Sequence, residues 1–310
     1  WQPVTVSLRR LFPLASFVGC GDIRVSEATD QSGRCVRRGL FAAVRGTRQD
    51  GLAYVEEALS RGVAALLGPH PVAKALVPQC VIPDVRAGYA KLCQALAGDP
   101  AGRLKLTGVT GTNGKTTTAW MLRSIWKAAG HPRGLLGTIE YDDGGHTQRA
   151  DLTTPAPEAL ASWLAAMVAR GTTHAALELS SHALDQDRAA GIALESVVLT
   201  NLTQDHFDYH GDLANYTAAK AAILDLCPPG GNVVFNADDP GIVSLVDAWR
   251  GGERDGHQIR SFGVEQDADV TGEVIAESVM GTRFLLTCRG TGSQSERQFE
   301  LNTRLVGRHN

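Results

Sequence analysis

Residues 110–117 read Thr-Gly-Thr-Asn-Gly-Lys-Thr-Thr and restrict the folds open to this chain more than any other segment. They follow an apolar stretch, 104–109, that we predict to be a strand, and they precede a helical pattern over 115–129. Glycines just before a helix let backbone N–H groups surround phosphate oxygens, and the helix N-terminus favours negative charge. The segment therefore predicts a phosphate-binding loop at the carboxyl end of a strand.

The residue types of this loop suit a nucleotide bound with magnesium. Lys115 is expected to reach the β- and γ-phosphates, and the hydroxyl of Thr116 to bind Mg²⁺. The strict pattern for such loops begins with glycine, where this chain has Val109, so a Gly-rich turn without a ligand is the alternative. The candidate ATP-binding residues are Gly111, Thr112, Asn113, Gly114, Lys115, Thr116 and Thr117.

The rest of the chain alternates strand and helix patterns, which predicts an α/β fold. We expect a small N-terminal α/β domain over 1–99, a Gly- and Pro-rich linker at 98–102, and a central domain over 104–305. The central domain should be of the P-loop type, with a mostly parallel sheet and helices on both faces. Its helix 115–129 is expected to carry Met121, Leu122, Ile125, Trp126 and Ala129 on one face. Strands are predicted at 39–44, 63–67, 80–82, 174–180, 197–200 and 232–235, helices at 51–60, 85–97, 155–170 and 215–226, and short β-like runs over 259–305.

Composition excludes several classes of protein. The net charge of −3 gives no electrostatic support for a nucleic-acid partner. No apolar run approaches the ~20 residues of a membrane helix, so we expect no membrane partner. The six cysteines form no C-x-x-C pair, which indicates reduced thiols in a cytoplasmic protein rather than disulfides or a zinc site.

Polar side chains follow two further predicted strands. Glu178 lies near the end of one, and Asn201, Asp205 and His206 follow the next. Ligands of open parallel sheets bind at the carboxyl ends of the strands, and Mg²⁺ prefers oxygen ligands. A magnesium-binding role for Glu178 and a ligand or acid–base role for His206 therefore stand beside the alternatives of a buried, hydrogen-bonded acid and a structural histidine. The patterns of a zinc protease helix and of a serine-hydrolase elbow do not occur.

Six ordered motifs together resemble the Mur ligase family, which forms amide bonds on a cell-wall precursor. The resemblance spans about residues 20–310 and is strongest to the family's MurE branch, which adds the third residue of the muramyl peptide to UDP-MurNAc-L-Ala-D-Glu. The motifs lie at 111–117, 152–155, 178–184, 200–211, 216–220 and 236–240.

This resemblance implies an ATP-dependent ligase that works through an acyl phosphate, with Lys115 among its catalytic residues. It implies that Thr116 and Glu178 hold one Mg²⁺ and that His206 and Lys220 serve a second. It also implies that Lys220 is carbamylated, whereas composition alone indicates a solvated helix lysine.

The resemblance further assigns residues to the substrates. Asn236 and Asp238 match contacts on the adenosine side of ATP, and Arg34 is the candidate for the uridine end of the precursor. There the chain has Gly33 where the family has serine, which leaves the mode of uridine binding open. The residues that match the grip on the nucleotide-sugar peptide are Thr153, Thr154, Ser180, Gln186 and Arg188.

Residues 306–310 resemble the start of the family's third domain, which recognises the incoming amino acid. We therefore expect a monomeric fragment that is incomplete for turnover, with diaminopimelate and lysine both open as the amino acid. A related ligase of the folylpolyglutamate or cyanophycin type, or a catalytically silent ATP-binding module, is the alternative function.

Overall fold

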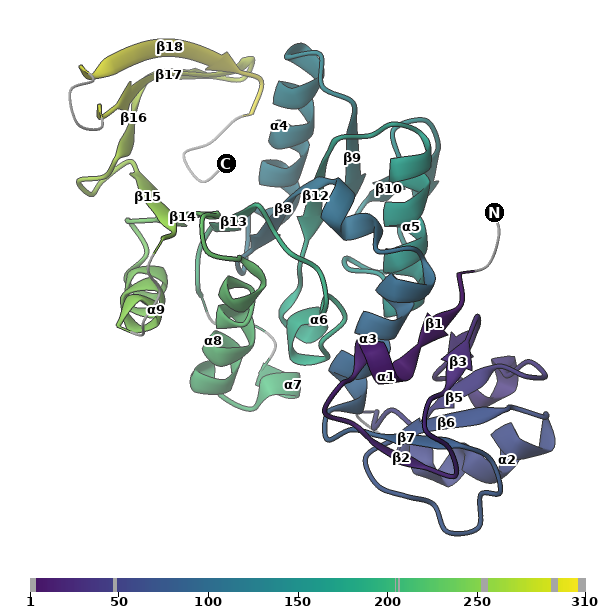
Figure 1. Cartoon of the computed structure of the whole chain (residues 1–310). Coiled ribbons are helices and arrows are strands. Elements are labelled where there is room, and N and C mark those ends of the chain that lie inside the picture. Colours follow the sequence, from purple (N-terminus) through teal and green to yellow (C-terminus); the bar gives the residue numbers. More distant parts are fainter. Residues whose placement is uncertain are drawn as a thin grey trace.

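The computed structural model describes residues 4–46, 49–203, 205, 207–251, 256–290 and 295–305. They form a mixed α/β fold with a small sheet near the N-terminus and a much larger sheet after it (Figure 1). Figure 1 shows the small sheet in purple and blue at the lower right, and the last strands in yellow at the upper left. The first elements, β1 (Val6–Ser7) and α1 (Leu8–Leu11), lead into it, and β1 pairs with β3 (Arg24–Val25).

The small sheet is buried on both faces. Leu40 and Ala42 of β5 (Leu40–Ala42) pack on the side of α3 (Val85–Leu96). Phe41 between them packs on the side of α2 (Val55–Ser60), because successive side chains of a strand point to opposite faces. The predicted strands and helices of this region are confirmed, although the helix at 51–60 begins as a 3₁₀ turn. The sheet order is β2 (Ser16–Val18), β7 (Gln79–Val81), β6 (Ala65–Gly68), β5 (Leu40–Ala42) and β4 (Ala28–Thr29), parallel except for β2; its helices are η1 (Ser32–Arg34), η2 (Gly51–Tyr54), α2 (Val55–Ser60) and α3 (Val85–Leu96).

The large sheet is parallel through its middle and antiparallel at both ends, which confirms the predicted fold class. Helix α5 packs on one face and α4 on the other. In order, the strands are β11 (Thr147–Arg149), β10 (Glu140–Asp142), β9 (Arg133–Leu136), β12 (His174–Glu178), β8 (Lys105–Thr110), β13 (Ser196–Leu199), β14 (Asn232–Asn236), β15 (Gln258–Gly263), β16 (Val270–Ser278), β17 (Gly281–Cys288) and β18 (Arg297–Thr303). The helices are α4 (Lys115–Ala128), α5 (Pro157–Ala169), α6 (Ser181–Asp185), α7 (Phe207–His210), α8 (Leu213–Ala221), η4 (Leu224–Leu226) and α9 (Pro240–Arg250).

The bounds predicted for the helix after the phosphate loop are confirmed, but its predicted apolar face is wrong in part. Met121 and Ile125 are 42% and 60% exposed. The face that packs on the sheet is centred on fully buried Ala119, with Leu122 and Trp126 beside it. These three positions follow the spacing of one helix face, displaced by about half a turn from Met121.

The segment predicted as a linker is a packed turn. Asp99 has a φ of +51°, and η3 (Pro100–Arg103) follows with Pro100 and Ala101 buried. The small and large sheets are also in apolar contact away from this turn, because Ala161 of α5, which packs on the large sheet, belongs to the apolar cluster of the small sheet. In the described part of the chain, none of the helices has the length and apolarity to cross a membrane.

Candidate active site

The loop between β8 and α4 is held by residues at the end of β13. The backbone N–H of Thr112 donates to the carbonyl of Asn201 at 2.9 Å, and that of Asn113 donates to its side-chain oxygen at 2.8 Å. Thr200 Oγ1 donates to the Asn113 carbonyl at 2.6 Å. Gly111 has a φ of +152°, which a residue with a side chain rarely adopts. The sequence thus places a fixed, glycine-dependent loop at the start of a helix.

Two lysine amines meet at this loop. Lys115 Nζ donates to the carbonyls of Gly111 at 2.8 Å and Thr112 at 3.0 Å, and burial lowers its pKa. Lys220 on α8 is 1% exposed and also donates to the Gly111 carbonyl, at 2.8 Å. Its burial and the neighbouring charge of Lys115 lower the pKa of Lys220 to about 7. A solvated helix lysine, which composition alone indicated, is therefore wrong for Lys220.

Glu178 ends β12 beside this loop, with Val109 of β8 as its register partner. It is 1% exposed, and its carboxylate accepts from Thr116 Oγ1 and Thr138 Oγ1, each at 2.8 Å. The backbone N–H of Thr138 donates to the other oxygen at 3.2 Å. A buried carboxylate surrounded by hydroxyl oxygens is a donor set that fits Mg²⁺. Sequence reasoning missed Thr138, which follows the apolar strand β9 at the same edge of the sheet.

The second predicted metal group lies partly outside the described residues. His206 is not among them, so its role as a ligand remains a prediction. Nearby, His210 of α7 is buried, with its Nε2 3.0 Å from Ser181 Oγ. Over the ranges that the structure describes, no three His, Cys, Asp or Glu side chains gather in a way that would hold a metal ion by themselves.

Four of the five residues predicted to grip the precursor come together in one hydrogen-bonded wall, and the fifth, Thr153, contacts Thr138 instead. Arg188 donates through Nε and Nη2 to Gln186 Oε1, at 3.1 and 2.8 Å, and through Nη1 to the Thr154 carbonyl at 2.9 Å. Gln186 Nε2 donates to Tyr209 Oη at 3.1 Å. Thr154 Oγ1 donates to the Glu178 carbonyl at 2.7 Å and accepts from the Ser180 N–H at 3.1 Å. These hydrogen bonds hold the side chains of the wall in place.

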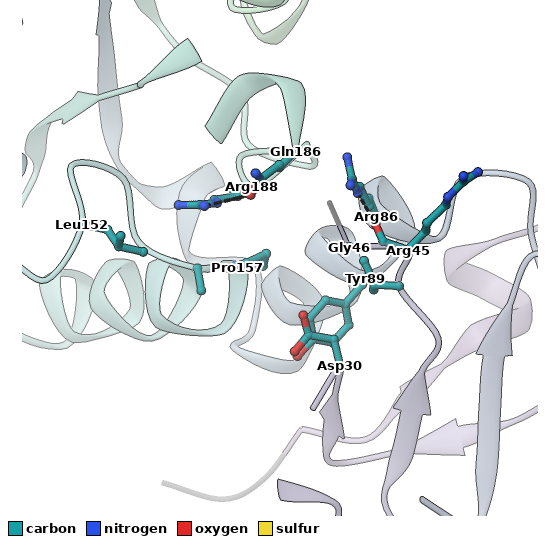
Figure 2. A pocket seen from close by; sticks show the side chains of 11 residues that line it. Asp30, Arg45, Gly46, Arg86, Tyr89, Leu152, Pro157, Gln186 and Arg188 are labelled. Carbon is teal, nitrogen blue, oxygen red and sulfur yellow. Dashed lines mark hydrogen bonds between the residues drawn. The ribbon is translucent and has the colours of Figure 1, made fainter. Parts of the chain in front are cut away.

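The wall faces a cavity of about 280 Å³ between the two sheets. Figure 2 shows Gln186 and Arg188 on one side of it and Arg45 and Arg86 on the other. Arg86 Nε donates to the Arg45 carbonyl at 2.8 Å. Three guanidinium groups in one cavity suit an anionic ligand. Sequence reasoning missed both Arg45 and Arg86. Arg86 lies on α3, but Arg45 follows the carboxyl end of β5, and ligands of parallel sheets bind at such strand ends.

Acidic and phenolic groups form the floor of this cavity. Tyr89 Oη donates to Glu158 Oε1 at 2.5 Å, which joins α3 to α5. Asp30 and Tyr89 line the cavity together (Figure 2). Burial, together with the neighbouring Glu158 carboxylate, raises the pKa of Asp30 to about 6. These contacts tie the small sheet to the large one at the base of the cavity.

Three predicted ligands are not among the residues that form these two sites. Arg34 in η1 is exposed and is not among the residues lining the cavity. Asn236 Oδ1 accepts from the Asp238 N–H at 2.9 Å. The Asp238 carboxylate accepts from the backbone N–H groups of residues 264, 265 and 266, so it fixes the turn after β15. Their contacts with uridine or adenosine remain predictions.

Comparison with known families gives this geometry a context. The family described as "Mur ligase middle domain" matches residues 109–310. The chain belongs to the Mur ligase family. The phosphate loop, Glu178 and Lys220 all lie within the matched range.

Mur ligases are also among the curated and solved proteins that this chain resembles. The UDP-N-acetylmuramoyl-L-alanyl-D-glutamate–2,6-diaminopimelate ligase of Parabacteroides distasonis is 34% identical over 297 residues, which cover 94% of this chain and 57% of that protein. The ligase of the same name from Synechococcus sp. is 42% identical over 247 residues, covering 75% and 49%. The chain spans about half the length of the curated relatives it matches.

A solved structure of a ligase with that name matches with a TM-score of 0.80 and 24% identity, covering 99% of this chain and 61% of the other. At this identity the likeness shows the fold alone. It covers the small sheet as well as the large one, so both follow the arrangement of a Mur ligase.

Proposed function

We propose that this chain is the precursor-binding and ATP-binding part of a ligase that adds the third amino acid to UDP-MurNAc-L-Ala-D-Glu. The observation that carries the proposal is the position of Glu178 between two sites. Its carboxylate accepts from Thr116 of the phosphate loop, and its carbonyl accepts from Thr154 of the arginine-lined wall. A phosphate donor and an anionic acceptor are thereby brought to one strand end.

The proposed reaction needs no protein nucleophile. The substrate carboxylate attacks the γ-phosphorus of ATP, ADP leaves, and the amine of the incoming amino acid then displaces phosphate from the acyl phosphate to form the amide. Lys115 holds the β- and γ-phosphates, and Arg188 orients the acidic peptide. Thr116 and Glu178 would hold a Mg²⁺ ion, which would supply positive charge to neutralise the phosphates.

A second magnesium ion would be served by His206 and Lys220 in this proposal. A neutral lysine amine combines with CO₂ to give a carbamate and a proton, which replaces a cation by an oxygen ligand. The burial of Lys220 and its place beside the loop carbonyl of Gly111 support such a modification. Asn236, Asp238 and Arg34 keep their proposed places at the adenosine and uridine ends.

The organisation of the chain is part of the proposal. Residues 1–99 would form the domain for the UDP-sugar, residues 104–305 the ATP-binding domain, and 306–310 would begin a third domain. We propose that the protein acts in the cytoplasm as a monomer. The names of the curated relatives favour diaminopimelate over lysine as the incoming amino acid.

Calorimetric titration tests this function. The chain is titrated with UDP-MurNAc-L-Ala-D-Glu, with UDP-MurNAc-L-Ala as the matched control, and separately with Mg-ATP. Selective binding of the dipeptide form is expected, because Arg188 should contact the added glutamate. Equal affinity for both precursors would refute the substrate, and binding of Mg-ATP alone would favour a silent ATP-binding module.

A further inference from the structure

Most of the hydrogen bonds to the Glu178 carboxylate come from Thr138, in the segment Gly137–Thr138. Thr138 supplies two of the three donors that contact the carboxylate, through its hydroxyl and its backbone N–H. A buried carboxylate without such donors would be destabilising, so the contacts of Thr138 stabilise the carboxylate and fix its orientation. Among the described residues, the third hydrogen-bond donor is the hydroxyl of Thr116.

The close approach of this segment requires glycine at position 137. A Cβ there would lie 2.1 Å from Glu178 Oε1. Without a side chain, the backbone comes near enough for the next N–H to reach the same oxygen. The loop after β9 is therefore shaped around the carboxylate.

Thr138 also contacts Thr153, the residue before Thr154 of the hydrogen-bonded wall. Its hydroxyl oxygen lies 3.2 Å from that of Thr153, a residue expected to bind the nucleotide-sugar peptide. A hydroxyl carries one proton, and a carboxylate can only accept. The single Thr138 proton is therefore shared between Glu178 Oε2 and Thr153 Oγ1, and the contact with Glu178 is the shorter of the two. The Thr138 hydroxyl thus links Glu178, which also accepts from Thr116 of the phosphate loop, to Thr153.

We propose that Thr138 is a positioning residue that couples the two sites, so that precursor and Mg-ATP each strengthen binding of the other. The inference rests on the proposed function for the identity of the two ligands. A ligand that hydrogen-bonds to Thr153 changes how strongly Thr153 competes for the Thr138 proton, and the effect reaches the Glu178 carboxylate that would hold magnesium. Reciprocity requires the same factor in both directions.

The test compares Thr138→Val, which keeps the shape and the backbone N–H but loses the hydroxyl, with Thr138→Ser, which keeps the hydroxyl. Thr147→Val on the exposed strand β11 is the control for the same chemical change elsewhere. The 310-residue chain is titrated calorimetrically with ATP in EDTA, with Mg-ATP, and with Mg-ATP at saturating UDP-MurNAc-L-Ala-D-Glu.

Loss of one hydrogen bond to a charged group predicts about tenfold weaker Mg-ATP binding for Thr138→Val. ATP binding in EDTA should stay within about twofold, and the enhancement by precursor should be lost. Thr138→Ser and Thr147→Val should behave as the unaltered chain. Thr153→Val should lose the enhancement even at a precursor concentration that direct titration shows to saturate this variant.

Two outcomes would overturn the inference. In the first, Thr138→Val binds Mg-ATP as tightly as the unaltered chain and shows the same enhancement by precursor. In the second, the valine and serine variants lose Mg-ATP affinity and precursor enhancement to the same extent. Should Thr138→Val not fold, Thr153→Val decides alone, because retained enhancement in that variant refutes the coupling. An unaltered chain that binds neither ligand would instead contradict the proposed function.

Discussion

Replacing Gly111 by alanine tests the geometry of the phosphate loop. A Cβ at this position would lie 1.8 Å from Thr200 Oγ1 and about 3 Å from backbone atoms of Asn201. The backbone conformation, φ +152°, costs a residue with a side chain about 1–3 kcal/mol. Thr200 must also turn away and lose its 2.6 Å hydrogen bond to Asn113, which is worth about 1 kcal/mol. We expect Gly111→Ala to destabilise the fold by about 3 kcal/mol or more.

Gly130→Ala is the matched control for this variant. Gly130 follows α4 with a φ of +75°, but no other heavy atom lies within 4 Å of an added Cβ. Its cost is the backbone conformation alone, about 1–2 kcal/mol. Urea unfolding followed by circular dichroism measures both free energies, and titration measures Mg-ATP binding. Gly111→Ala should lose that binding, whereas Gly130→Ala should keep it. Equal destabilisation of the two variants, or full Mg-ATP affinity in Gly111→Ala, would refute the reasoning.

Three further predictions concern charged groups. Lys115→Ala should abolish ATP binding and leave precursor binding largely intact in parallel titrations; equal loss of both would argue against separate sites. The pKa of Asp30 is raised to about 6 from its ordinary value of 3.8, so between these pH values the folded protein binds a proton that the unfolded chain does not. The contribution of Asp30 to the free energy of unfolding therefore falls as the pH rises through this window. Asp30→Asn should therefore be more stable than the unaltered chain by about 2–3 kcal/mol at pH 7.5 and equal to it below pH 4, as urea unfolding at both pH values would show. Carbamylation of Lys220 should give a carbamate signal by ¹³C NMR in labelled bicarbonate, and a signal that persists in Lys220→Arg would assign it to another amine.

The sequence contained enough to predict the phosphate loop and the strand-end carboxylate. Both depend on short-range patterns, namely a glycine-rich segment between a strand and a helix, and a polar residue after an apolar run. Glu178 and the loop then meet because neighbouring parallel strands end at the same edge of the sheet. The general rule of parallel sheets thus placed Thr116 and Glu178 together without any knowledge of distances.

Long-range contacts were beyond such patterns. Thr138 lies 40 residues from Glu178, and Tyr89 lies 69 residues from Glu158, so neither pair leaves a local signal. The short hairpin strands β10 and β11 were likewise missed, because three residues show no periodicity. The buried state of Lys220 was indicated only by family resemblance, since lysine is rarely buried and its helix is otherwise ordinary.

Three of the five N–H groups of Arg188 donate to Gln186 and Thr154, so two remain for a ligand. Because these contacts restrain the side chain beforehand, binding does not have to freeze its rotamers, which would otherwise cost about 2 kcal/mol. An acid group entering the cavity meets donors whose position is already set. The two remaining N–H groups can reach the same carboxylate only from a restricted set of positions in the cavity. The cavity therefore selects an acid group by its position as well as by its charge.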